Sequence, residues 1–255
     1  MTTKITPALK KRMNAVPLGW VPSNVLGQKE TFRLRFWTDL HGPILKWDGG
    51  FASVAKELYG VDLDLRQVRH YMMGYDIRLP ITPAEFANVF KIVVRLKGKD
   101  GYGGLEVREG APEAFSEIRA AGIPFEISTW VPGATEHDHE TLKAFGTGIA
   151  QSGTIEHLMK LGIIKNPMRD IRFISPGKKA EAMTEDHIAL IIEDNPVTAV
   201  HAGYAYGNAC IMTPDSYNEH LVSPGVLRIN DMSELAPAVI DFFEKLEKAG
   251  ALCGF

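Results

Sequence analysis

The chain has 255 residues, 45% hydrophobic and 23% charged, which is the balance of an ordinary globular protein with room for one large domain carrying a smaller one. Its formal net charge of −3 gives no reason to expect nucleic-acid or membrane partners, and no apolar run approaches the roughly 20 residues of a membrane span. Two cysteines argue against a disulfide framework, and the N-terminus lacks the apolar core of a secretory signal, so we expect a cytoplasmic protein.

The first part of the chain predicts an arm followed by a strand. Residues 1–30 are interrupted by three prolines, Pro7, Pro17 and Pro22, and we interpret them as an N-terminal arm. The aromatic-rich run from Phe32 to Trp37 favours a strand that ends at Asp39, two residues before His41.

Residues 49–97 carry helical patterns instead. Apolar residues recur on one helical face from Phe51 onwards, and Gly60 is a stop signal. The stretch TPAEFANVFKIVVRLK begins with a capping box made by Thr82 and Glu85. It is followed by residues 98–104, in which four of seven residues are glycine, as in a hinge. We therefore predict a helical cap over residues 49–104.

Beyond the hinge, predicted helices and strands alternate along the chain. The expected helices cover residues 111–122, 153–162 and 233–250, and the expected strands cover residues 123–129, 171–175, 187–195 and 208–212. Such alternation is typical of a parallel sheet covered on both faces. The predicted fold is thus α/β: a Rossmann-like parallel sheet with helices on both faces, formed by residues 31–48 and 105–255, plus a small α-helical cap inserted after the first strand.

Polar side chains follow the predicted strands where each strand ends. They are Asp39 and His41, Ser128 and Thr129, Lys178 and Lys179, and the pair Glu193 and Asp194. In a doubly wound sheet the carboxyl ends of the strands form the functional edge, so these groups should converge. Carboxylates, a hydroxyl and an ammonium at one edge suit Mg²⁺ together with a phosphate, and an aspartate there can attack phosphorus.

Four ordered motifs, FWTDLHGPI, FEISTW, SPGKK and LIIEDNP, give the chain a resemblance to the haloacid dehalogenase-like superfamily. The cap lies between the first and second motifs, a layout most similar to phosphatases related to 5'-deoxyribonucleotidases. For the metal, the resemblance implies Asp39 as nucleophile and Mg²⁺ ligand, the backbone carbonyl of His41 as a second ligand, and Asp194 as a third, with Glu193 as its neighbour.

For the phosphoryl group, the resemblance implies a hydroxyl and a lysine. Thr129 would bind a phosphoryl oxygen, with Ser128 as the competing choice of register. Lys178 would neutralise the nucleophile and the phosphate, and Lys179 is the alternative.

His41 departs from the pattern of the phosphatases in this superfamily. They carry a second aspartate two residues after the nucleophile, and it protonates the leaving alcohol. A histidine is also able to act as a general acid near neutral pH, so His41 is the candidate for this role.

The sequence therefore predicts a Mg²⁺-dependent hydrolase of a small phosphate monoester, with nucleotides among the candidates, acting through an aspartyl-phosphate. The partners expected are a small phosphorylated molecule and a second copy in a homo-oligomer, without nucleic acid or membrane. Two alternatives stay open because of His41: an enzyme of the same fold that attacks carbon or a phosphonate, and a ligand-binding or scaffold protein without turnover.

Overall fold

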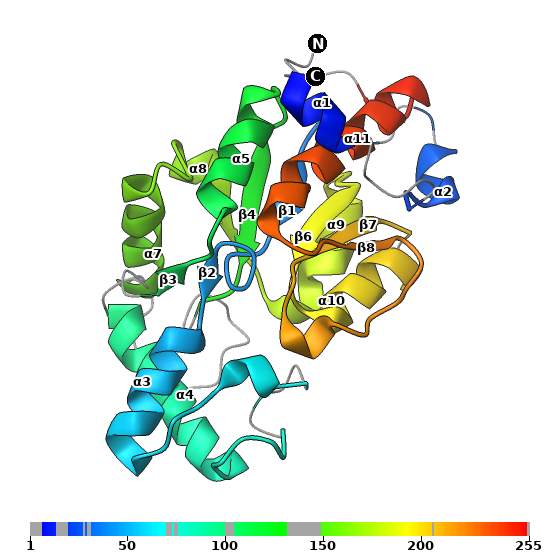
Figure 1. Ribbon diagram of the computed structural model, residues 1–255. Coiled ribbons are helices and arrows are strands. Elements are labelled where there is room, and N and C mark those ends of the chain that lie inside the picture. The colour runs from blue at the N-terminus through cyan, green and yellow to red at the C-terminus, as the bar shows by residue number, and fades with distance from the viewer. Residues whose placement is uncertain are drawn as a thin grey trace.

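A six-stranded sheet forms the centre of the computed structural model, which describes residues 7–13, 20–27, 29, 32–69, 73, 76–99, 105–131, 149–205 and 207–253 (Figure 1). Its strand order is β5-β4-β1-β6-β7-β8, and every neighbouring pair is parallel. The strands are β1 (Phe36–Thr38), β4 (Phe125–Thr129), β5 (Ile171–Phe173), β6 (Leu190–Glu193), β7 (Ala209–Met212) and β8 (Val226–Arg228). The predicted Rossmann-like α/β fold is confirmed.

Apolar side chains leave both faces of this sheet, because consecutive strand residues point to opposite sides. In β6, Ile192 packs against the helices α5 (Ala111–Ala120) and α11 (Leu235–Lys248), whereas Ile191 packs on the other face with α9 (Lys179–Glu185) and α10 (Pro196–Val200). A strand buried on both faces requires a continuous apolar run, which is the pattern that predicted it.

The remaining elements are short or lie at the periphery. They are α1 (Pro7–Met13), α2 (Ser23–Leu26), α7 (Ile149–Lys160), α8 (Pro167–Asp170), the π-helical η4 (His201–Ala205), and the 3₁₀ turns η3 (Pro176–Lys178), η5 (Ser216–Asn218) and η6 (Met232–Glu234). Part of the predicted arm belongs to the core: Trp20 and Val25 join the main hydrophobic cluster, and α1 packs against α11.

Several predicted borders differ from the structure. The strand predicted from Phe32 begins at Phe36, because Phe32 pairs instead with Leu252 near the other end of the chain. Strand β8 and the antiparallel pair of β2 (Leu45–Lys46) and β3 (Glu106–Val107) were not predicted, since strands of two or three residues are too short to show a period.

The helical segment after β1 has a hydrophobic cluster of its own. It contains α3 (Asp48–Tyr59), η1 (Leu65–Gln67) and α4 (Pro83–Lys99), and we call these three elements the cap segment. The predicted capping box of α4 is present: Glu85 accepts from the backbone N–H of Thr82 at 2.7 Å, and Thr82 accepts in return at 3.3 Å. Most of the predicted hinge, residues 100–104, lies outside the described residues, and the predicted domain borders stay predictions.

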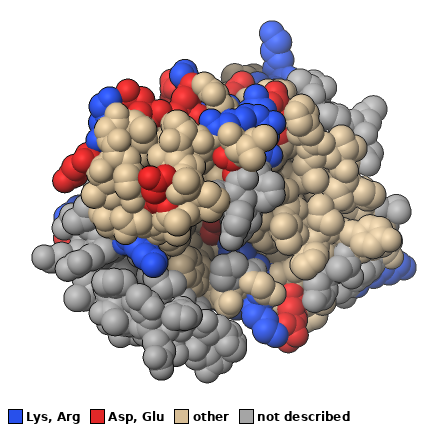
Figure 2. Space-filling view, turned by 90° about the horizontal axis from the view of Figure 1, so that it is seen from below, with Lys and Arg blue, Asp and Glu red and all other residues tan. Residues whose placement is uncertain are grey.

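The cap segment lies beyond the carboxyl ends of the strands, where β1 and β6 point toward it in Figure 1. Seen from that side, Lys and Arg side chains lie next to Asp and Glu side chains along the upper edge of the view, and the described residues form no large area of a single charge (Figure 2). Within the described part of the chain, none of the helices has the length and apolar character needed to cross a bilayer.

Candidate active site

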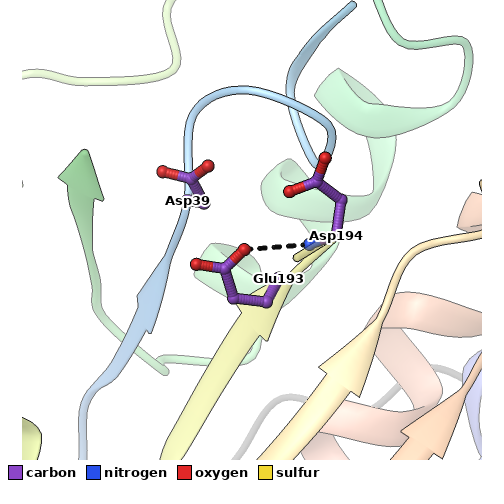
Figure 3. Close-up of side chains that lie close together, drawn as sticks. All are labelled: Asp39, Glu193 and Asp194. Atoms are coloured by element: carbon purple, nitrogen blue, oxygen red, sulfur yellow. Dashed lines mark hydrogen bonds between the residues drawn. The ribbon is translucent and has the colours of Figure 1, made fainter. Parts of the chain in front are cut away.

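Three carboxylates converge where β1 and β6 end. Asp39 follows β1, and Glu193 and Asp194 lie at the end of β6, with the backbone N–H of Asp39 donating to Ile192 at 2.8 Å. Because the two strands are parallel neighbours, their carboxyl ends meet. The three side chains point toward one another (Figure 3), and one oxygen from each lies within 4.8 Å of the others. The acids predicted for this edge are therefore brought together.

A buried lysine joins two of these carboxylates, and it is Lys179. Its ammonium donates to Asp39 Oδ1 at 2.7 Å and to Glu193 Oε1 at 2.8 Å. Lys178, the residue predicted for this place, pairs with Glu181, and its side chain is 58% exposed. Neighbouring helical residues point about 100° apart, so only one of the two lysines faces the site. The first residue of α9 takes that position.

The charges at this site leave an excess of negative charge. With all three carboxylates ionised, they and the one ammonium sum to −2. Burial raises the pKa of Asp194 well above its usual range, and the nearby carboxylates of Glu193 and Asp39 raise it further. Burial alone would lower the pKa of Lys179, but Asp39 and Glu193 outweigh burial and raise it, so the ammonium stays charged. Clustered carboxylate oxygens with unbalanced charge fit a hard divalent cation such as Mg²⁺.

Ser128 and Thr129 leave opposite faces of β4. Glu126 accepts from the indole N–H of Trp37 on the α9 face, so strand alternation places Ser128 on that same face and Thr129 on the other. The pairing of Thr38 with Ile127, continued by one residue, sets Ser128 beside Asp39. The buried Ser128 hydroxyl has no hydrogen-bond partner within the described residues, while Thr129 donates weakly to the Trp130 carbonyl at 3.4 Å. The structure thus favours the Ser128 register over the predicted Thr129.

His41 is buried in the stretch of chain between β1 and the cap segment. Its ring stacks on that of Trp47, with 4.5 Å between the ring centroids. Burial lowers the pKa of His41 to about 4, against the opposing effect of the Asp39 carboxylate and with help from Lys179. The imidazole is therefore neutral at neutral pH. The predicted role as general acid needs a protonated ring, which this environment disfavours. The predicted metal contact through the His41 carbonyl stays a prediction.

Gly42 allows the loop after Asp39 to pass close to Asp194. Its φ of +86° lies in the left-handed region, and a Cβ at this position would lie 2.3 Å from Asp194 Cγ. Arg108 holds the same loop from the other side, because its Nε donates to the Gly42 carbonyl and its guanidinium pairs with Asp215 at 2.7 Å. Gly42 and Arg108 therefore hold the loop after Asp39 close to Asp194.

Substitution Gly42→Ala is expected to distort the site severely. The new methyl group would require Asp194 to move, and the left-handed backbone adds about 1–2 kcal/mol of strain for a residue other than glycine. Gly60→Ala is the matched control, because Gly60 has a φ of +70° with open space around its Cβ position. Thermal unfolding and Mn²⁺ binding would compare the two variants. Equal losses of stability and equal Mn²⁺ affinities would contradict the close packing of Gly42 on Asp194.

Four functional-site residues were not singled out from the sequence. Arg108 contacts the loop after Asp39, while Tyr217 and Asn218 contact Asp194, and Asp215 pairs with Arg108. Three of them belong to the run TPDSYN, which directly follows the predicted strand at residues 208–212. A polar run at the carboxyl end of a strand was the available signal, whereas Arg108 follows a two-residue strand and carried none.

Comparison with known proteins gives structural neighbours only. A HAD family hydrolase from Deinococcus radiodurans R1 has a TM-score of 0.48 at 21% identity, over 88% of this chain and 99% of that one. A haloacid dehalogenase-like family hydrolase from Xanthomonas campestris has 0.47 at 17%, over 88% and 96%. A putative beta-phosphoglucomutase from Thermotoga maritima has 0.45 at 13%, over 81% and 98%. No protein-family model and no curated protein matches the sequence.

Two of these three neighbours carry the name of the superfamily that the four motifs resemble. At identities of 13–21% these likenesses concern the fold, and both the superfamily resemblance of the four motifs and the narrower likeness to nucleotidases stay predictions.

Proposed function

We propose that the chain is a Mg²⁺-dependent hydrolase of small phosphate monoesters, with Asp39 as the nucleophile. The observation that carries this proposal is the buried ion-pair group in which Lys179 holds both Asp39 and Glu193 beside Asp194. Burying four charged groups together is costly, and a scaffold would gain nothing from it. The arrangement does suit a charged substrate, because a dianionic phosphate and a divalent cation add no net charge to the site.

Each residue has a defined task in the proposed reaction. Asp39 Oδ attacks phosphorus, and the bond between phosphorus and the leaving oxygen breaks, with the leaving oxygen taking a proton from water. Water then hydrolyses the aspartyl-phosphate, which releases phosphate and regenerates the Asp39 carboxylate. Lys179 orients the Asp39 carboxylate and balances its charge. In this proposal the Ser128 hydroxyl donates to a phosphoryl oxygen, which its lack of a hydrogen-bond partner among the described residues supports.

Asp39 and Asp194, with Glu193 beside them, would hold the metal. When bound, Mg²⁺ would stabilise negative charge on the transferring phosphoryl group. The chemistry of the donors, which are all carboxylate oxygens, matches the preference of this ion and not that of a softer metal.

The proposal is tested by phosphate release from a panel of esters. The panel contains nucleoside monophosphates, sugar phosphates and an activated aryl phosphate, each with Mg²⁺ and with EDTA. We expect turnover of at least one ester with Mg²⁺ and its loss with EDTA. The ratio of aryl to nucleoside rates reports how far the site, with neutral His41, assists the leaving group. Metal-independent turnover, or no release from any ester, would contradict the proposal.

A further inference from the structure

The loop that follows β7 reaches the acidic cluster through two side chains. We call residues 213–219 the clamp loop. In it, the Tyr217 hydroxyl donates to Asp194 Oδ2, and the Asn218 amide donates to the Asp194 backbone carbonyl at 3.0 Å. Asn218 also donates to the Thr213 carbonyl at 3.0 Å, which closes the loop on itself. Both the backbone and the carboxylate of Asp194 are therefore held by this one loop.

The same loop is in contact with the cap segment. The ring of Tyr217 packs against the hydrophobic cluster of the cap segment, and the Ser216 hydroxyl donates to the Leu65 carbonyl at 3.2 Å. Arg69 and Glu219 form an ion pair at 3.6 Å beside this contact. The ring of Tyr217 thus packs in the hydrophobic cluster of the cap segment, and its hydroxyl donates to Asp194, a candidate metal ligand.

We propose that Tyr217 is a positioning residue that couples docking of the cap segment to metal binding at Asp194. This inference rests on the metal site of the proposed function. The Asp194 carboxylate has two oxygens. A hydrogen bond from Tyr217 to Oδ2 fixes the plane of the group and leaves Oδ1 oriented for the metal. Partners of this kind orient metal ligands, and losing one typically weakens metal affinity about 10–100-fold.

The coupling has to act in both directions. If cap docking places Tyr217 on Asp194 and so strengthens metal binding, then metal binding must stabilise the docked cap by the same factor. The contact between Ser216 and Leu65 places the 3₁₀ turn η1 at the docking surface. Residues 61–69, which contain this turn, are therefore the segment whose protection from exchange should respond to the metal.

The test measures binding of Mn²⁺ alone, by the loss of its free-ion EPR signal, so no substrate or turnover is involved. We expect Tyr217→Phe to bind Mn²⁺ about 10–100-fold more weakly than wild type, because the ring stays in the cap cluster while the hydrogen bond is lost. Tyr59→Phe is the matched control: Tyr59 packs in the same cluster, and its hydroxyl accepts from Asn88 at 3.0 Å. This variant should bind like wild type.

Hydrogen exchange supplies the second arm. Mn²⁺ should slow amide exchange of residues 61–69 in wild type and in Tyr59→Phe, and should leave it unchanged in Tyr217→Phe. Equal Mn²⁺ affinity in wild type and Tyr217→Phe would overturn the coupling and leave the proposed hydrolase intact. Absence of Mn²⁺ binding to wild type would overturn both the coupling and the metal site.

Discussion

Replacing Asp39 by asparagine is expected to abolish turnover, by a factor on the order of 10⁴ or more, because no other group would replace the attacking carboxylate. The amide has nearly the same shape, so the geometry of the site should be kept. Lys179 retains its contact with Glu193, and the cluster loses one negative charge, so that its sum with all carboxylates ionised changes from −2 to −1. The variant should therefore fold as stably as wild type, and the loss should be a loss of chemistry. Initial rates of phosphate release and thermal unfolding would measure the two effects separately.

Retained turnover in Asp39→Asn would exclude Asp39 as the nucleophile. Conversely, loss of turnover accompanied by loss of the folded state would leave the chemical role unproven, so the unfolding measurement is part of the experiment. Among the described carboxylates of the cluster, Asp39 is the one that follows β1, and it accepts a hydrogen bond from the Lys179 ammonium.

Lys179→Met is expected to lower both stability and activity. Lys179 is 5% exposed, and its removal would leave the carboxylates of Asp39 and Glu193 buried without their cation. Breaking a buried ion pair from one side typically costs about 3–5 kcal/mol of the free energy of unfolding. Activity should fall as well, because Asp39, the proposed nucleophile, loses the ammonium that orients its carboxylate. Denaturant unfolding with and without Mg²⁺ would show the effect, and the added cation should recover part of the stability.

Lys178→Met is the matched control for this variant. The two lysines are neighbours in the sequence, but Lys178 is paired at the surface with Glu181, and exposed pairs of this kind contribute little to stability. We expect Lys178→Met to resemble wild type in unfolding and in turnover. A larger effect of Lys178→Met than of Lys179→Met would contradict the placement of the buried lysine.

The general position of the site could be predicted from the sequence, because strand ends are visible in it. Apolar runs that end in acids, as before Asp39 and before Glu193, indicate buried parallel strands whose carboxyl ends meet. The capping box of α4 could be predicted equally well, since its two partners, Thr82 and Glu85, lie within four residues of one another. Local patterns therefore sufficed for the fold class and for the position of the acids.

The choice between neighbouring residues could not be predicted. Whether Lys178 or Lys179 enters the site depends on the residue at which α9 begins, and helix borders are the least certain feature of a sequence pattern. The choice between Ser128 and Thr129 depends on the register of β4 against β1. Contacts such as that of Tyr217 with Asp194 join residues 23 positions apart through a loop with no period, so no local rule identifies them.

The most direct test of the proposed chemistry is to trap the enzyme during turnover and locate the phosphoryl group. Wild-type protein and Asp39→Asn would be mixed with the best ester from the panel in the presence of Mg²⁺, quenched in acid within a few milliseconds and digested for mass spectrometry. Attack by Asp39 predicts a peptide containing Asp39 that carries one phosphoryl group in wild type and none in the variant. A phosphoryl group on any other residue, or an unmodified wild-type protein during steady turnover, would contradict the assignment of Asp39 as the nucleophile.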